Sequence, residues 1–232
     1  MLRQAGRVLV VAVERVGVVT VASERSTGLS DPSGTELRIA AFAGSLRRTS
    51  LNRALLRAAR ELAPEGMTIE LIEIGDLPLF NADIEAEGDP PVVDTFKAHL
   101  RDADGVLIAT PEYNDGIPGA LTNAIDWGSR LPGRSPLVGK PVALMGASPS
   151  QIGTARAQLH LRQLLAHVHA RTLPSPELLI SKAHEKFDQE LRLTDEGTRR
   201  VLAGLLTRFG HWITRERAAR EAERALAMAA QR

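Results

Sequence analysis

The chain of 232 residues contains no cysteine. This absence excludes disulfides, thiolate metal sites and a cysteine nucleophile, and it agrees with a protein of the reducing cytoplasm, where we expect it. The chain also has no excess of charge of one sign, because it contains 29 lysines and arginines and 28 aspartates and glutamates, for a formal net charge of +1. Such a balance provides no field that attracts nucleic acid, so we expect no nucleic-acid partner.

Long hydrophobic runs are missing as well, and we therefore expect no membrane partner. The apolar stretches at Val8 to Val13 and Val16 to Ala22 are short and separated by charged residues, and no small-residue cleavage pattern follows a single apolar core. A segment rich in Gly, Ser, Asp and Pro follows, from Ser26 to Glu36. We interpret residues 1–36 as an N-terminal extension that is poorly ordered, with an added hairpin as the alternative.

The rest of the chain alternates between short apolar runs and helical patterns, which is typical of a doubly wound α/β fold. The hydrophobic fraction of 44% suits one globular domain, which we expect to span residues 37–213, followed by a charged helical tail over residues 214–232. The expected strands are Leu37 to Ala43, Thr68 to Ile74, Gly105 to Thr110, Pro141 to Ala147 and Glu177 to Ile180. Helices are expected between them.

The loop from Gly44 to Asn52 has the composition of a phosphate-binding loop. It leaves the first expected strand at a glycine and leads into a helical pattern, where unpaired N–H groups favour an anion. Further donors in the loop are Ser45, Arg47, Thr49, Ser50 and Asn52. Neither the dinucleotide fingerprint nor the Walker pattern is present, so the loop indicates a monophosphate site. The alternatives are an exposed surface arginine at Arg47 and a simple helix cap at Ser50.

A second loop, from Pro111 to Gly119, suits a flat ring. It offers turn backbone around residues 114–116 and the only tyrosine of the chain, Tyr113. In an open sheet of order 2-1-3-4-5 the first and third strands are neighbours, so the two loops meet over one crevice. A phosphate at one loop and a planar heterocycle at the other describe flavin mononucleotide, FMN.

Three ordered segments, residues 44–53, 111–127 and 146–158, resemble the signature segments of the flavodoxin-like NADPH-dependent FMN reductases. That family includes quinone, chromate and azo-dye reductases. The resemblance runs from about Leu37 to Ile180 and implies a flavodoxin-like three-layer sandwich: a five-stranded parallel sheet of order 2-1-3-4-5 with helices on both faces. It also implies bound FMN, NADPH or NADH as co-substrate, and a homodimer or homotetramer.

Position by position, the resemblance assigns cofactor binding to eleven residues. Those expected around the phosphate are Ser45, Arg47, Ser50, Leu51 and Asn52. Those expected around the isoalloxazine edge are Pro111, Glu112, Tyr113, Asn114, Gly116 and, from a third loop, Ser148. The chain departs from the family at Gly116, where a serine is frequent, and at Thr122, where a lysine is frequent. Glycine at position 116 removes a hydroxyl contact to the ligand and leaves that contact to the backbone. Threonine at position 122 removes a positive charge at the start of a helix.

The resemblance implies an oxidoreductase in which hydride passes to flavin N5 and then to a small-molecule acceptor, a quinone, flavin, azo compound or oxyanion, in ping-pong order. The flavin carries this chemistry, so no catalytic side chain is required. One alternative is a non-enzymatic electron carrier of flavodoxin type, which the lack of acidic charge disfavours. A module kept for protein interaction is another, and the complete phosphate loop disfavours it.

Several other residues receive structural interpretations. The spacing of His160, His167 and His169 is only superficially that of metal ligands, because no carboxylate completes a set, and we expect no metal site. We interpret Trp127 as a core or subunit contact and Asn123 as a residue that caps or cross-links helices.

Overall fold

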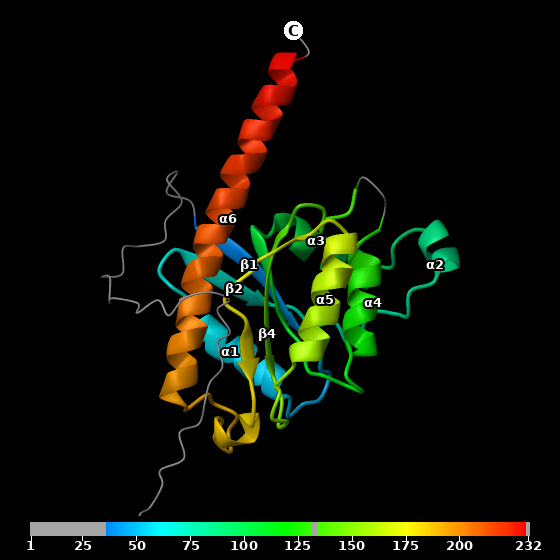
Figure 1. The fold of residues 1–232 in the computed structure, drawn as a ribbon. Helices are drawn as coiled ribbons and strands as arrows, with labels where there is room; N and C mark the ends of the chain where they lie inside the picture. The colour runs from blue at the N-terminus through cyan, green and yellow to red at the C-terminus, as the bar shows by residue number, and fades with distance from the viewer. Residues whose placement is uncertain (1–35, 131–133, 231–232) are drawn as a thin grey trace, which may run out of the picture.

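A parallel β-sheet in the strand order β2-β1-β3-β4-β5 forms the centre of the protein (Figure 1). The computed structural model describes residues 36–130 and 134–230, so the prediction for the N-terminal extension falls outside it except at Glu36. The strands are β1 (Leu37–Ala43), β2 (Met67–Leu71), β3 (Gly105–Ala109), β4 (Pro141–Ala147), β5 (Arg171–Thr172) and β6 (Leu178–Ile180). The predicted flavodoxin-like order is confirmed.

Two strands differ from the prediction. The second strand ends at Leu71, because its pairing with β1 ends at the Ala41 partner and the chain then turns away from the sheet. The expected fifth strand, Glu177 to Ile180, corresponds to β6, and the sequence does not predict the short strand β5 before it; β5 and β6 are two short pieces that both pair with β4. Pro174 and Pro176 lie between the pieces, and proline has no N–H to continue the hydrogen-bond ladder.

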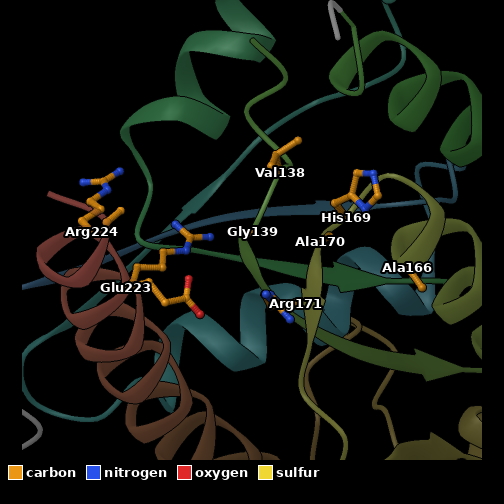
Figure 2. A pocket seen from close by; sticks show the side chains of 10 residues that line it. Val138, Gly139, Ala166, His169, Ala170, Arg171, Glu223 and Arg224 are labelled. Carbon is orange, nitrogen blue, oxygen red and sulfur yellow. The ribbon is translucent and has the colours of Figure 1, made fainter. Parts of the chain in front are cut away.

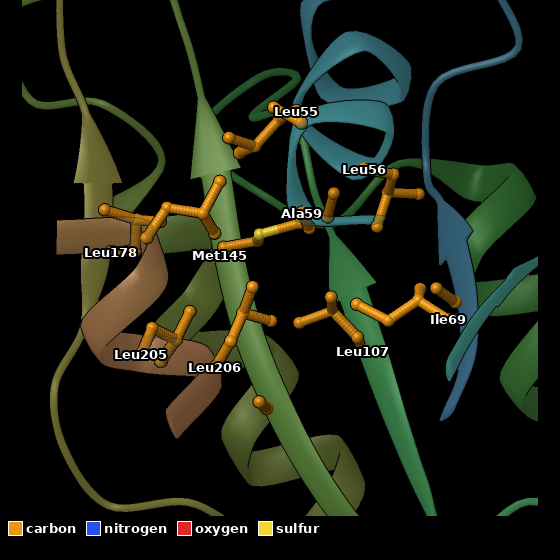
Figure 3. Packing of buried hydrophobic residues seen from close by; sticks show 14 of the residues in the cluster. Leu55, Leu56, Ala59, Ile69, Leu107, Met145, Leu178, Leu205 and Leu206 are labelled. Atoms are coloured by element: carbon orange, nitrogen blue, oxygen red, sulfur yellow. The ribbon is translucent and has the colours of Figure 1, made fainter. Parts of the chain in front are cut away.

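The helices cover both faces of the sheet. Helices α1 (Leu51–Glu61) and α6 (Glu196–Ala230) pack on one face, and α3 (Pro91–Asp102), α4 (Gly119–Gly128) and α5 (Ala155–His167) pack on the other. Figure 3 shows the first of these cores, where Leu55 of α1 and Leu205 of α6 lie over Met145 of β4. A short helix, α2 (Ala82–Ala86), and a 3-10 turn at Ala183–Glu185 complete the described elements.

The segment between β2 and α3 is attached to α4 by two side chains. Asn123 accepts a hydrogen bond from the N–H of Phe80 (2.8 Å) and donates to the carbonyl oxygen of Pro78 (2.9 Å). The indole N–H of Trp127 donates to the same carbonyl (2.8 Å), and the ring is completely buried. Trp127 is therefore a core residue, and Asn123 links α4 to a loop rather than to another helix.

Helix α6 runs without a break through residue 214, where the sequence predicted the tail to begin. Its last buried side chain is Ile213, and Figure 1 shows that its C-terminal part extends beyond the body of the domain. Arg217 still contacts the domain through an ion pair with Asp104 (2.6 Å). Among the described residues, no helix combines the length and the apolar character needed to cross a membrane.

Candidate functional site

A cavity of about 300 Å³ lies at the carboxyl ends of β1, β3 and β4, where open α/β folds bind ligands. It brings together every predicted site residue except Asn114 and Gly116. The full lining is Ser45, Arg47, Thr49, Ser50, Leu51, Asn52, Pro111, Glu112, Tyr113, Ala147, Ser148 and Pro149. The assigned set lacked Thr49, Ala147 and Pro149, although each is the direct neighbour of an assigned residue or signature segment.

The wall of the cavity depends on a close approach at Gly146, near the end of β4. A Cβ atom at this position would overlap the hydroxyl of Thr154 and lie only 2.5 Å from the carbonyl oxygen of Thr110. Glycine therefore lets β4 pack against the end of β3 and the start of α5. This approach brings the loops after β3 and β4 together.

The start of α1 supplies donors for an anion. The Ser50 hydroxyl caps the helix by accepting a hydrogen bond from the N–H of Arg53 (3.2 Å), and it is buried, as is Ser45. The N–H groups of Leu51 and Asn52 lie in the first helical turn, where no intrahelical acceptor exists. Arg47 is exposed at the rim. Hydroxyls, free N–H groups and one guanidinium are the donors that bind a phosphate monoester.

The side chain of Asn52 is fully engaged with the protein itself. Its amide nitrogen donates to the carbonyl oxygen of Ala147 (2.9 Å), and its amide oxygen accepts from the N–H of Ala147 (2.9 Å). The group is buried, and both polar atoms have partners. The geometry therefore leaves the backbone N–H of Asn52 for an anion, and its side chain fixes α1 to the end of β4.

The loop after β3 makes a tight turn between Tyr113 and Gly116. These two residues exchange backbone hydrogen bonds of 3.2 and 2.9 Å, and Asn114 and Asp115 both have positive φ angles, as in a type I′ turn. The N–H groups of Tyr113 and Gly116 are therefore hydrogen-bonded within the turn. Asn114 and Asp115 are thus the residues of the turn whose N–H groups remain for a ligand.

Tyr113 connects the two loops predicted from the sequence. Its hydroxyl donates to the Ser45 hydroxyl oxygen over 3.3 Å, and 47% of the residue is exposed. The phenol ring therefore lies at the mouth of the cavity. An exposed aromatic ring beside hydrogen-bonding backbone suits contact with a planar heterocycle.

Glu112 has a structural partner in the third loop. Its carboxylate accepts hydrogen bonds from the N–H groups of Arg156 (2.9 Å) and Ala157 (3.0 Å), at the start of α5. A carboxylate at a helix N-terminus also interacts favourably with the helix dipole. Arg156 forms an ion pair with Asp115, so the turn after β3 is attached to α5 at two points.

Within residues 36–130 and 134–230, no three His, Asp or Glu side chains are placed to hold a metal ion. The cavity combines hydrogen-bond donors that suit an anion with an exposed aromatic side chain that suits a flat ring. The residues present fit FMN.

Comparisons with known proteins match most of this chain. The model of the NADPH-dependent FMN reductase family matches residues 37–185. The NAD(P)H-dependent FMN reductase of Pseudomonas aeruginosa is 45% identical over 182 residues, which cover 78% of this chain and 98% of that protein. The quinone reductase of Escherichia coli K12 is 42% identical over 183 residues, or 78% of this chain and 97% of that protein.

A solved structure also matches. The flavoenzyme NAD(P)H:(acceptor) oxidoreductase of Paracoccus denitrificans superposes with a TM-score of 0.72 and 38% sequence identity. The match covers 78% of this chain and 98% of that one.

Proposed function

Because the chain belongs to the NADPH-dependent FMN reductase family, we propose that it takes hydride from NADPH or NADH and delivers the electrons to a quinone at the cavity above β1 and β3. FMN, when bound, supplies a ring that accepts hydride at N5 and returns the electrons later. One observation carries this proposal: anion donors and an exposed aromatic ring share a single cavity at the switch point of the sheet.

The phosphate is held by the start of α1. The hydroxyls of Ser45 and Ser50, the guanidinium of Arg47, and the N–H groups of Leu51 and Asn52 converge on one end of the cavity. Arg47 is the only one of these groups with a formal charge, and it is exposed, so it reaches a ligand without a desolvation cost in the free protein. These donors orient the cofactor from its phosphate end.

The ring is held by the loops after β3 and β4. Pro111, Tyr113 and Pro149 supply apolar surface, and the Ser148 hydroxyl supplies a polar contact at the edge. Glu112 does not act as a base, because its carboxylate is committed to the N-terminus of α5. The N–H groups of the turn at Asn114 stabilise negative charge on the ring edge. Gly116 closes the turn through its backbone.

Apart from Glu112, whose carboxylate is bound to the start of α5, no acid and no histidine is among the described residues that line the cavity, and the mouth is open beside Tyr113. The same surface therefore serves the nicotinamide and then the acceptor, which gives ping-pong order. The open mouth suits quinones foremost, and free flavins, azo compounds and oxyanions as further acceptors. A cytoplasmic location and a homodimer or homotetramer stay predictions.

The test uses protein loaded with FMN and mixed rapidly with NADPH, followed at the flavin band at about 450 nm. We expect bleaching at least as fast as steady-state turnover, and reoxidation when quinone is added without nicotinamide. Steady-state kinetics with NADPH and a quinone should give parallel double-reciprocal lines. Bleaching too slow to support turnover would contradict the reductase proposal and favour the non-enzymatic electron carrier.

A further inference from the structure

A second cavity lies at the amino ends of β4 and β5, at the opposite end of the strands from the cavity described above. Its volume is about 710 Å³, and Figure 2 shows it between α6, which carries Glu223 and Arg224, and the segments that carry Val138 and His169. The other lining residues are Gly139, Ala166, Ala170, Arg171, Arg220 and Ala227. The flavin cavity is at the carboxyl ends of the strands, so the two cavities are separate.

The lining of this cavity is strongly basic. It contains three arginines, Arg171, Arg220 and Arg224, but a single carboxylate, that of Glu223. A further carboxylate outside the lining, that of Glu216, lies 3.9 Å from Arg171. Even with both carboxylates counted, the positive charges are in excess.

One nitrogen atom of Arg220 lacks a hydrogen-bond acceptor, although the carboxylates of Glu216 and Glu223 lie close enough to act on the guanidinium. A Cβ atom at Gly139 would lie 2.8 Å from Cζ and 3.0 Å from Nε of Arg220, so the guanidinium packs directly on the glycine backbone. Its Nη2 atom is buried and has no hydrogen-bond partner among the described residues. A guanidinium carries five N–H donors, and leaving buried ones unpaired costs free energy. Arg220 also lines the cavity and is partly exposed, so the rest of its guanidinium can reach an anion there.

The neighbouring Lys140 is affected by the same arginine. Burial lowers its pKa to about 8, and the guanidinium of Arg220 acts in the same direction. Asp102 and Asp104 act in the opposite direction without restoring the ordinary value. Asp104 is also the partner of Arg217 on α6, so its charge is shared.

We propose that this cavity binds a small oligophosphate anion between α6 and the start of β4. Several guanidiniums around one space match the geometry of phosphate oxygens better than a single lysine does. The volume accommodates more than one phosphate group, and a carboxylate alone would engage only one arginine fork. Bound there, the anion links the part of α6 beyond Ile213 to the domain.

The experiment is isothermal titration of the FMN-saturated protein with pyrophosphate, with ionic strength held constant by potassium chloride. We expect saturable binding and an increase in the midpoint of thermal unfolding with pyrophosphate concentration. Arg220→Gln should weaken binding roughly tenfold or more, the size expected for lost hydrogen bonds to a charged group. Glu223→Gln should tighten it, because it removes the one repelling carboxylate of the lining.

The control variant is Arg200→Gln, which changes an exposed arginine on the same helix outside the cavity. It should bind pyrophosphate as the unmodified protein does. If Arg220→Gln does not retain its fold and its FMN, Arg171→Gln provides the second test, because that side chain is largely exposed. Absence of saturable binding, equal affinity in the cavity and control variants, or release of FMN by pyrophosphate overturns the proposal.

Discussion

The side-chain amide of Asn52 forms two hydrogen bonds of 2.9 Å with the backbone of Ala147, one as donor and one as acceptor. The two residues are 95 positions apart in the chain. This pairing imitates one step of a β-ladder and closes the gap between α1 and the end of β4. The two loops that we propose to hold the phosphate and the ring of FMN are thereby held at a fixed separation.

Asn52→Asp should therefore weaken both the fold and FMN binding. The new carboxylate keeps the size of the amide but faces the carbonyl oxygen of Ala147 without a proton to donate, and we expect a loss of about 1–3 kcal/mol in the free energy of unfolding. Urea unfolding of apo-protein and FMN titration measure the two effects. Asn81→Asp is the control, because it is the same change at an exposed helix cap outside the cavity, where a carboxylate accepts the same hydrogen bond. Equal stability of the two variants would show that the Ala147 pairing contributes little.

Arg47→Ala should weaken FMN binding by about 1.5–3 kcal/mol, the range for a lost charge-assisted hydrogen bond, and leave the fold intact. The guanidinium is exposed at the rim and its one contact, a hydrogen bond of 3.4 Å to Thr49, is too long to stabilise the fold much. Titration of apo-protein with FMN gives the affinity. The neighbouring exposed residue provides the control, Arg48→Ala, and equal affinities in both variants would contradict the phosphate assignment.

The sequence was sufficient to predict the parts of the site that are local. Gly44 after a buried run, and hydroxyls before a helical pattern, occur within one strand-loop-helix unit, and the cavity lining includes those hydroxyl residues. The roles of Asn52 and Glu112 could not be predicted, because their partners come from distant segments at Ala147 and Arg156. A polar residue in a predicted binding loop can bind a ligand or its own scaffold, and only the fold decides which.

For the fold too, local features could be predicted from the sequence and contacts between distant segments could not. The alternation of apolar runs and helical patterns predicts a doubly wound sheet, and the family resemblance implies its order. The presence of two short strands, β5 and β6, depends on which residues pair with β4. The basic cavity depends on α6 lying beside Gly139, a contact that local periodicity does not encode. Charge counted over the whole chain, +1, conceals that local excess.

Gly146→Ala should destabilise the protein and weaken FMN binding together. The added methyl group overlaps Thr154 and crowds the carbonyl oxygen of Thr110, so β4 must shift, at an expected cost of about 1–3 kcal/mol. Gly119→Ala is the matched control: at the start of α4 an added Cβ would meet no neighbouring atom within 4 Å, and alanine there should be neutral or slightly stabilising. Thermal unfolding of the two variants with and without FMN compares them. Equal midpoints would contradict the close approach at Gly146.

The stability of α6 should depend on pH through Asp195, which precedes the helix. Its carboxylate oxygen Oδ1 accepts hydrogen bonds from the N–H (2.8 Å) and hydroxyl (2.5 Å) of Thr198 and from the ammonium of Lys186 (3.1 Å). The Thr198 hydroxyl is the largest cause of a lowered pKa at Asp195, and the lysine charge adds to it. Because the folded pKa is below the unfolded one, the ionised group stabilises the fold at neutral pH, and this contribution is lost as the pH falls below about 4.

Asp195→Asn should therefore destabilise the protein at neutral pH and have a smaller effect in acid. The amide still caps the helix, so the change isolates the charge and leaves the buried ammonium of Lys186 without its counter-charge. Urea unfolding of both proteins, measured from neutral pH to below about pH 4, gives the difference in the free energy of unfolding at each pH. Asp76→Asn, at an exposed aspartate, is the control and should show no such convergence. A difference between Asp195→Asn and the unmodified protein that stays constant across this range would mean that the carboxylate charge does not stabilise the start of α6.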